Sequence, residues 1–526
     1  MSNEYRARSS RHERRLSRRA RKDFDIVEAT ADKVTENLGE LEGQSRERIS
    51  RHTTVSRESS GLSVTAIAIQ AVVSLLLGLS FYAFPLWNQL ATPLQSQNLY
   101  SGLAMQHGLV PFNDFYGTGG TLFYVLNWLG NFAGSTLILW ILEVVALFIS
   151  GIITFQLVFN QTKSQNAATI ISNFTLIIVA GLARGGDAPT LFALPFALWA
   201  VKFLNDYFRE DSTDRGFIRF GMAGAVTLVI SPIMTMFFVF SAIALLIYNV
   251  SHRRFWHGFY QMLAVVLGIS IIGYSVAYYA LNQQTLYTSI EQSVLIPLTH
   301  FGPTDSLLLT IAKALVLTLI FGIVTGFVQG VIQIKNAGRA TIWYATLLVG
   351  TVIVTTMIIF AQTFDSSNLL AVLPFTVVFS GLGVKDAEQV FLKYLQNRLF
   401  APILGILFII SAPFAYHHLN NAIFTEEKAI AQFIQENGQS TDRVYVLGAD
   451  KNINNLTRKV ATLDNVPADY PIKFTQNYDL KVASLKDKYI IIEAGRAVPK
   501  NLSQLLSSNY KIAPYAGKHF LIYQKK

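Results

Sequence analysis

The sequence predicts a polytopic α-helical membrane protein with about eleven transmembrane helices and a small α/β domain at its C-terminal end. Of its 526 residues, 51% are hydrophobic and only 14% are charged, and the mean hydropathy is +0.37. A soluble enzyme with a solvated surface does not have so apolar a composition. The basic residues also gather at the N-terminal end and between alternate apolar runs, as they do in multi-pass membrane proteins.

Residues 1–60 are predicted to form a basic, mostly disordered cytoplasmic tail. The first 22 residues hold nine Lys and Arg against two Glu, and no apolar segment with a small-residue cleavage site follows them. This segment is therefore not predicted to be a cleaved signal peptide. Two roles remain open for its charge, namely contact with anionic lipid headgroups and, as we favour, fixing the orientation of the chain. Nucleic acid is not an expected partner.

A transmembrane domain is predicted over residues 61–418. A helix that crosses roughly 30 Å of hydrocarbon needs about 20 apolar residues. Eleven runs approach this length, at 64–87, 135–159, 167–182, 190–207, 217–231, 234–250, 259–281, 307–332, 342–360, 369–384 and 399–417. A shorter run at 122–132 is predicted to be a helix that lies along the membrane within a first outer loop, residues 88–134.

The distribution of Lys and Arg supports this order of spans. With the N-terminus inside, the short outer loops carry only Arg184, whereas the short inner loops and their edges carry twelve basic residues. Such an asymmetry is typical of a correct topology, and it places the N-terminus in the cytoplasm and the C-terminal segment outside. The twelve are Lys163, Lys202, Arg209, Arg215, Arg219, Arg253, Arg254, Lys335, Arg339, Lys385, Lys393 and Arg398.

Residues 419–526 are predicted to form an extracytoplasmic α/β domain. The segment is polar and alternates helical patterns ("EEKAIAQFIQEN", "PKNLSQLLSSN") with strand patterns ("RVYVLG", "YIIIEA", "YKIAPY", "HFLIYQK"). The stretch "VLGAD" resembles a fragment of a nucleotide site but lacks a full Gly-rich fingerprint that opens a helix. We expect a lid, an acceptor-binding module or a structural domain.

A transporter and a membrane-embedded transferase both fit these spans. Transporters usually show internal repeats with polar breaks near the membrane midplane, and no repeat is evident in this sequence. The polar residues gather instead on the predicted outer side, which favours an active site facing the outside. They are Asp114, Arg184, Asp187, Glu291, His300 and Asp365.

The first outer loop resembles that of the GT-C superfamily of polyprenyl-phosphate-sugar-dependent glycosyltransferases, in the branch of protein O-mannosyltransferases and the lipid A aminoarabinose transferase. The resemblance depends on a pattern of "HG", "P-aromatic", "D-aromatic", a Gly-rich patch and "Leu-aromatic-Tyr" that follows the first span. The matching residues are Tyr100, Ala104, His107, Gly108, Pro111, Phe112, Asp114, Phe115, Gly120, Leu122 and Tyr124.

The resemblance implies transfer of a sugar from a lipid-linked phosphate donor to a hydroxyl or similar acceptor, with an acidic residue of the first outer loop as base. The sequence departs from the family here, because the positions of the usual acidic pair hold Ser96 and Gln97. Asp114 and Asp187 are then the catalytic candidates. The structural alternatives are that Asp114 caps a turn in "PFNDFYG" and that Asp187 is the N-cap of the fourth span.

Six further residues are candidates for substrate binding. Arg184 suits the donor phosphate, with an ion pair to Asp187 as the alternative. Lys313 lies within the eighth span and either faces a polar cavity or extends to the headgroups. His107 and His300 are candidate donors to phosphate or sugar, with an interfacial position as the alternative. Tyr100 and Asn113 are candidates for contacts with the sugar. For the ring of Tyr100, the alternative is a place at the membrane interface.

These inferences combine into one hypothesis. The chain is predicted to be a multi-pass glycosyltransferase of a bacterial plasma membrane that uses a polyprenyl-phosphate sugar and a teichoic acid, wall polysaccharide or protein as acceptor. No cofactor is expected, and the isolated outer carboxylates predict no metal site. The absence of Cys excludes disulfides and Cys nucleophiles. Two alternatives stay open: a transporter or flippase for a lipid-linked glycan, and a non-catalytic relative that binds the lipid-linked sugar.

Overall fold

The computed structural model describes residues 62–526 apart from 210–215, 304–305, 383, 385–400, 449, 468–469 and 516. The chain divides into two compact units, Met1–Leu62 and Ser63–Lys526, and nearly all of the described residues belong to the second. The predicted tail over 1–60 and four of the predicted inner basic residues lie outside the described residues. These four are Arg215, Lys385, Lys393 and Arg398.

Helical segments stand at all eleven predicted apolar runs. Six helices of the described part are long and apolar enough to cross a membrane, and a bent pair brings the number to seven. The count of eleven spans and their orientation stay predictions. The segments are α2 (Val64–Gly78), α5 (Leu137–Thr162), α6 (Gln165–Ala183), α7 (Pro189–Phe208), α8 (Phe217–Ile230), η3 with α9 (Pro232–Thr235, Met236–Ser251), α10 (Phe255–Asn282), α13 and α14 (Leu307–Ile320, Ile323–Gln333), η5 and η6 with α15 (Ile334–Asn336, Gly338–Ala340, Thr341–Ile359), η7, α16 and η8 (Ser366–Val372, Leu373–Thr376, Val377–Phe379) and α18 (Pro402–Leu419).

Two of the predicted spans are not continuous α-helices. The run at 307–332 is broken between α13 and α14, whose axes differ by 68°, and Gly322 at the break has a φ of 70°. The run at 369–384 starts in η7 and continues through α16 and η8. These are short helical pieces, and almost all of their residues are buried. Irregular backbone is tolerated in a membrane protein where other helices cover it, since lipid offers no hydrogen-bond partners.

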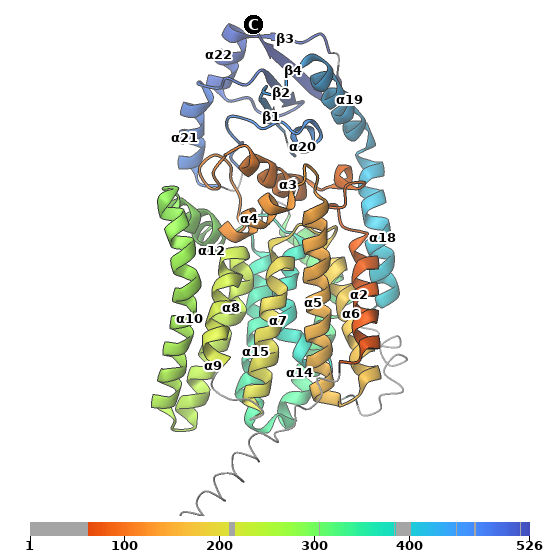
Figure 1. Cartoon of the computed structure of the whole chain (residues 1–526), viewed down its shortest axis with the longest axis vertical. Coiled ribbons are helices and arrows are strands. Elements are labelled where there is room, and N and C mark those ends of the chain that lie inside the picture. Colours follow the sequence, from red (N-terminus) through yellow and green to blue (C-terminus); the bar gives the residue numbers. More distant parts are fainter. Residues whose placement is uncertain are drawn as a thin grey trace, which may run out of the picture. The chain divides into compact units, whose positions relative to one another are not determined.

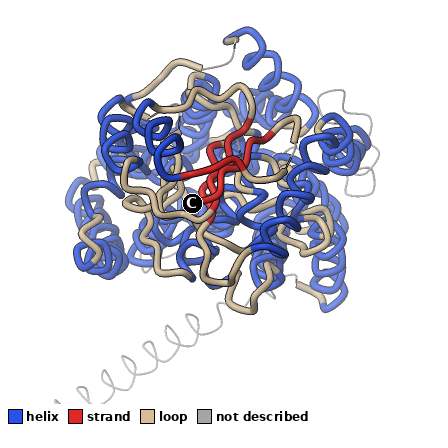
Figure 2. Tube along the Cα trace, turned by 90° about the horizontal axis from the view of Figure 1, so that it is seen from above, coloured by secondary structure: helices blue, strands red, loops and turns tan. Residues whose placement is uncertain are grey.

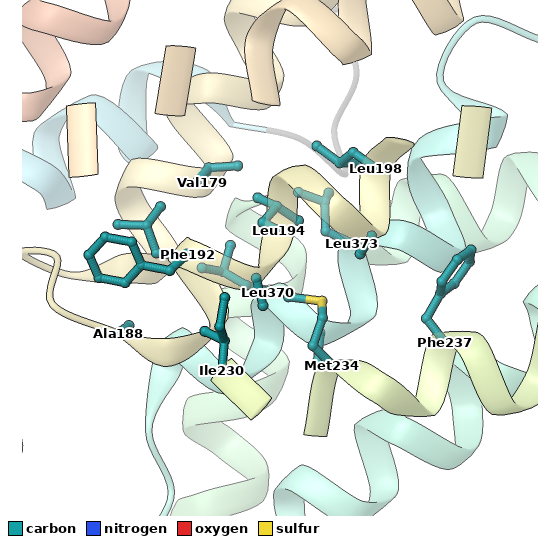
Figure 3. Packing of buried hydrophobic residues seen from close by; sticks show 14 of the residues in the cluster. Val179, Ala188, Phe192, Leu194, Leu198, Ile230, Met234, Phe237, Leu370 and Leu373 are labelled. Atoms are coloured by element: carbon teal, nitrogen blue, oxygen red, sulfur yellow. The ribbon is translucent and has the colours of Figure 1, made fainter. Parts of the chain in front are cut away.

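The core of the membrane domain surrounds α7. Thirteen residues of this helix are buried, on all of its faces, which is typical of a helix enclosed by others. In Figure 3, Leu194 and Leu198 of α7 lie among Val179 of α6, Met234 of η3 and Leu370 of η7. By contrast, α10 lies at the edge of the bundle in Figure 1 and is mostly exposed, as expected of a helix that faces lipid.

The first outer loop is helical in two places. It contains η1 (Asn88–Leu90), α3 (Pro93–Gln106) and α4 (Thr121–Gly130). Helix α4 lies at the run that was predicted to lie along the membrane. Helices α3 and α4 cross closely because Gly102 has no side chain, since a Cβ there would lie 2.4 Å from the carbonyl oxygen of Asn127. A further outer segment forms α11 (Leu286–Ile290), the π-helical η4 (Glu291–Leu295) and α12 (Ile296–Thr299).

The C-terminal segment contains a four-stranded mixed sheet, which Figure 2 shows in red. The strand order is β1-β2-β4-β3, and only β1 and β2 are parallel. Separate buried clusters, with Tyr445 in one and Val444 in the other, pack on the two faces of the sheet. The elements are α19 (Asn421–Asn437), β1 (Val444–Leu447), α20 (Asn452–Thr457), α21 (Ile472–Val482), β2 (Tyr489–Glu493), α22 (Lys500–Asn509), β3 (Tyr510–Ile512) and β4 (Phe520–Lys525).

Candidate functional site

Hydrogen bonds join the first two outer loops, although 89 positions of sequence separate them. Gln95 of α3 donates from Nε2 to the carbonyl oxygens of Arg184 (2.7 Å) and Gly186 (3.1 Å). One turn later, Asn98 donates from Nδ2 to the carbonyl oxygen of Asp187 at 2.8 Å. The second loop offers these carbonyls because residues 184–187 all have positive φ, between 43° and 95°. The two loops therefore form one folded layer.

Asp187 is buried inside this layer. Its side chain is 1% exposed, and Asn127 of α4 donates to Oδ1 at 3.2 Å. The backbone N–H of Asp187 donates to the carboxylate of Glu143 on α5. Burial raises the pKa of Asp187 to about 7, against the opposing effect of the Asn127 hydrogen bond. The N-cap of α7 is Ala188, so the predicted capping role of Asp187 is wrong: the carboxyl group is turned to α4 instead.

Asp114 lies in a turn at the other end of the first loop. Its carboxylate accepts the backbone N–H of Val110 at 2.8 Å and the side-chain amide of Asn113 at 2.9 Å. Asp114 is half-buried and Asn113 is exposed. Asp114 therefore caps the turn "PFNDFYG", as the structural alternative predicted. A carboxylate that keeps part of its surface accessible can hold this turn and still take a proton from an acceptor.

Tyr100 contacts the C-terminal domain, and His107 lies within the electrostatic influence of its basic residues. The Tyr100 ring is 1% exposed, its hydroxyl accepts the backbone N–H of Ala461 at 3.1 Å, and the Lys451 ammonium lies 5.4 Å from the ring centre. His107, at the end of α3, is more exposed, and partial burial and the nearby Arg458 lower its pKa. Tyr100 thus lies on the side of α3 that the C-terminal domain covers.

The remaining candidates lie apart from one another. Arg184 is half-buried as the left-handed C-cap of α6, and its charge acts on Tyr82 and Tyr416. Within the described residues, no ion pair joins Arg184 to Asp187. Lys313 is exposed on α13. His300 lines a cavity beside the first outer loop.

A cavity of about 400 Å³ opens beside the first outer loop. Its walls are mostly apolar, with a few polar groups, which is the usual composition of a ligand pocket. Thr118 of the first loop and Pro189 at the start of α7 contribute to the walls, four and two positions after Asp114 and Asp187. The other polar groups of the lining are Ser231, Thr235, Ser293, His300, Gln362, Thr363 and Asn368.

The positions of the missing acidic pair contact the C-terminal domain. Ser96 Oγ accepts the backbone N–H of Lys451 at 3.0 Å, and Gln97 donates from Nε2 to Asp464 at 2.7 Å. Lys451 and Asp464 form a buried ion pair with an N–O distance of 2.5 Å. The sequence pattern did not identify this pair, because both residues lie in an irregular polar stretch far from α3. The carboxylate of Asp464 thus lies against the first outer loop at Gln97.

A glycine anchors the end of the first loop to α8. The Gly120 N–H donates to the carbonyl oxygen of Ile230 at 3.0 Å, and a Cβ at Gly120 would lie 2.2 Å from the carbonyl oxygen of Val229. Gly120→Ala should therefore lower the free energy of unfolding by about 1–3 kcal/mol, because the backbone has to move. Thermal unfolding in detergent measures this loss.

Gly273→Ala is the matched control for that variant. Gly273 lies in α10, and no atom lies within 4 Å of the position of its Cβ. Alanine is preferred to glycine in a helix by about 1 kcal/mol, so this variant should unfold no earlier than the wild type. Equal unfolding temperatures for the two variants would show that the first loop does not depend on the contact with α8.

Comparisons with known proteins cover nearly the whole chain. Residues 56–421 match the family model described as the putative competence-induced protein Ccs4 N-terminal domain, and residues 424–526 match the model of the Ccs4 C-terminal domain. No curated protein sequence matches the chain. Among the described residues, no group of three or more His, Cys, Asp and Glu side chains is placed to hold a metal ion.

Two solved structures of ArnT share the fold of this chain. ArnT from Cupriavidus metallidurans bound to undecaprenyl phosphate has a TM-score of 0.59 at 10% identity, over 88% of this chain and 98% of ArnT. The apo form of ArnT has a TM-score of 0.57 at 8% identity, over 87% and 97% of the two chains. An oligosaccharyltransferase from Archaeoglobus fulgidus has a TM-score of 0.42 at 13% identity, over 90% and 75%. This chain thus shares the fold of ArnT, and the fold that the resemblance of the first outer loop implied is confirmed.

Proposed function

This chain belongs to the family of the putative competence-induced protein Ccs4, and we propose that it is an integral membrane glycosyltransferase that takes a sugar from a polyprenyl-phosphate donor. The acceptor is a cell-envelope glycan or protein, and the compartment is the plasma membrane with the site facing outward. The observation that carries the proposal is the extent of the shared fold, which covers 98% of an ArnT chain whose structure holds undecaprenyl phosphate.

The cavity beside the first loop supports this proposal. Its volume of about 400 Å³ is within the range of pockets for small ligands. Its apolar walls suit a polyprenyl segment, and the imidazole of His300 and the amides of Gln362 and Asn368 suit a phosphate or a sugar hydroxyl. A lipid donor held in this way confines the sugar to the plane of the outer loops, where the acceptor arrives.

The roles of the candidate residues follow from their positions. Asp114 is proposed as the base, since it is the acidic residue of the first loop that keeps part of its surface accessible. Asp187 is proposed to act indirectly, by holding the layer of the two outer loops together. Its carboxyl group accepts from Asn127, and its backbone N–H donates to Glu143. Arg184 and Lys313 do not line the cavity beside the first loop, so the contact with the donor phosphate that their charge suggested stays a prediction.

A second candidate function is supported by the contacts of Ser96 and Gln97. Both side chains are engaged by the C-terminal domain, so neither is available for chemistry in the described arrangement. A relative that binds the lipid-linked sugar without transferring it would need no base at these positions. The first proposal instead assigns the chemistry to Asp114.

Reconstitution distinguishes these functions. The full chain is placed in vesicles that contain a polyprenyl-phosphate sugar with a labelled sugar, and wall glycan, teichoic acid or surface protein is added outside. Label in the acceptor is the result expected. Label that crosses the bilayer without transfer would establish a flippase, and donor that binds without either event would establish a non-catalytic relative.

A further inference from the structure

A second cavity, of about 200 Å³, lies at the carboxyl ends of the parallel strands of the C-terminal sheet. Gly448 and Asp450 follow β1, and Glu493 ends β2. Phe520 of β4, the register partner of Glu493, also lines the cavity. In open α/β sheets, ligands bind in the crevice outside the carboxyl ends of the strands. The position alone therefore makes this cavity a candidate site.

The cavity is acidic. Three carboxyl groups line it, from Glu427 of α19, Asp450 and Glu493, and its lining contains no Lys or Arg. Arg496 pairs with Glu493 at 3.1 Å from outside this lining. The walls thus present more negative than positive groups to whatever enters.

Glu427 has the least compensated carboxyl group of the three. Its side chain is 1% exposed, and its Oε2 accepts the side-chain amide of Asn452 at 3.2 Å. Its Oε1 is buried and receives no N–H or O–H donor from the described residues. The carboxyl group of Asp450 lies close to it, and a hydrogen bond between the two carboxyl groups requires that one of them holds a proton. A buried carboxylate in this position needs a proton or a cation from outside the chain.

Aromatic rings complete the walls. Tyr416 and Phe424, from α18 and α19, and Phe520 line the same cavity as the carboxyl groups. Carboxylates together with aromatic faces attract organic ammonium ions, through charge and through cation–π contact. A metal ion prefers several converging oxygen ligands, and the described residues include no such group of three.

We propose that this cavity binds an organic ammonium group, with Glu427 and Asp450 as its counter-charges and the aromatic rings as its walls. A volume of about 200 Å³ is below the ~300 Å³ of a pocket for a whole drug-sized ligand, so the cavity accepts a headgroup or one amino-substituted part of a larger molecule. Pro93 of α3 and Asn420 after α18 also line it, which places the site between the outer loop and the C-terminal domain. The site goes beyond the proposed transfer, since it can be occupied in the absence of any donor.

Proton linkage follows from the same geometry. Burial and the adjacent Asp450 raise the pKa of Glu427 to about 9, and burial also raises the pKa of Asp450. The empty site therefore holds a proton at neutral pH, and an entering cation displaces it. Affinity for choline, whose charge does not depend on pH, should therefore rise as the pH is raised above neutrality, because the site then holds less of the proton that has to be displaced. The charged and titratable groups around this pair are Tyr416, Lys451, Glu493, Arg496 and, acting on Tyr416, Arg184; Asn452 is a neutral hydrogen-bond donor to both carboxyl groups.

Titration calorimetry on the purified full chain, without donor, tests the proposal. Choline is compared with its uncharged carbon isostere, and glucosamine with N-acetylglucosamine, so that a lipid-type headgroup and an amino sugar are distinguished. Binding of at least one charged member is expected, with release of the proton that it displaces from the site. Glu427→Gln and Asp450→Asn should each weaken it by about tenfold or more.

Glu436→Gln is the matched control, because Glu436 is an exposed residue of the same helix that does not line the cavity. This variant should bind as the wild type does. If Glu427→Gln does not fold, Asp450→Asn and the pH dependence of the wild type decide the matter. Four results would each overturn the proposal, whatever the outcome of the transfer assay. They are equal binding of the uncharged isosteres, binding of Mg²⁺ or Ca²⁺ in place of the ammonium ions, no binding at all, and binding that is unchanged in both variants.

Discussion

Asp114→Asn is expected to reduce the rate of sugar transfer by about 10²–10⁴-fold, the usual contribution of a general base. The fold should survive, because the amide oxygen of Asn can still accept the Val110 N–H that Asp114 accepts at 2.8 Å. Donor binding should also survive, since the base acts on the acceptor. Initial rates in reconstituted vesicles with labelled donor, together with donor binding in detergent, measure the two effects separately.

Asp442→Asn is the control for this change. Asp442 also caps its own turn, since it accepts the Gln439 N–H at 2.6 Å, and it belongs to the C-terminal domain. It should transfer sugar at the wild-type rate. Should Asp114→Asn do the same, Asp114 would have only the capping role and the base would have to be sought elsewhere.

Lys451→Met is expected to lower the free energy of unfolding by about 3–5 kcal/mol, because it leaves a buried charge without its partner. The side chains of Lys451 and Asp464 are 4% and 2% exposed, and they meet at 2.5 Å. Without the ammonium, Asp464 keeps the amide of Gln97 as a side-chain donor, which does not neutralise it. Thermal unfolding in detergent should show the loss, and proteolysis should show earlier release of the C-terminal domain from α3.

The partly exposed pair of Lys488 and Asp442 provides the comparison. Its side chains are 31% and 12% exposed and meet at 3.0 Å, so Lys488→Met should cost no more than about 1 kcal/mol. The double variant Lys451→Met/Asp464→Leu should recover part of the loss, since no unpaired charge remains. If Lys451→Met and Lys488→Met cost the same, the buried pair does not anchor the domain to the first loop.

The helical segments of the membrane domain were predictable because hydrocarbon solvent imposes a length and a composition on each segment that spans it. The same criterion is insensitive to backbone geometry. Hydropathy therefore did not predict the 68° bend between α13 and α14 or the short helical pieces from Ser366 to Phe379. Such irregular backbone is tolerated where other helices cover it.

The candidate site was predictable in part. The pattern of the first outer loop indicated the fold. The polar residues of the predicted outer side included His300, which lines the cavity, whereas Asp114 and Asp187 do not line it and only Thr118 and Pro189, near them in the sequence, do. The sequence pattern did not indicate that Tyr100 contacts Ala461, 361 positions away, because periodicity carries no information about such distant partners. The carboxyl groups of Glu427 and Asp450 were missed for the same reason, since "EEKAIAQFIQEN" and "VLGAD" have no feature that pairs them.

The sequence by itself determined that this is a membrane protein, where its helical segments lie and which superfamily its first outer loop resembles. These properties are local, since each depends on the hydropathy or residue types of one continuous stretch. Only the tertiary structure decided that Ser96 and Gln97 contact the Lys451–Asp464 pair, that Asp187 is buried under α4, and that three carboxyl groups meet at one edge of the sheet. Those outcomes depend on burial and on contacts between distant segments, which exist only once the chain has folded.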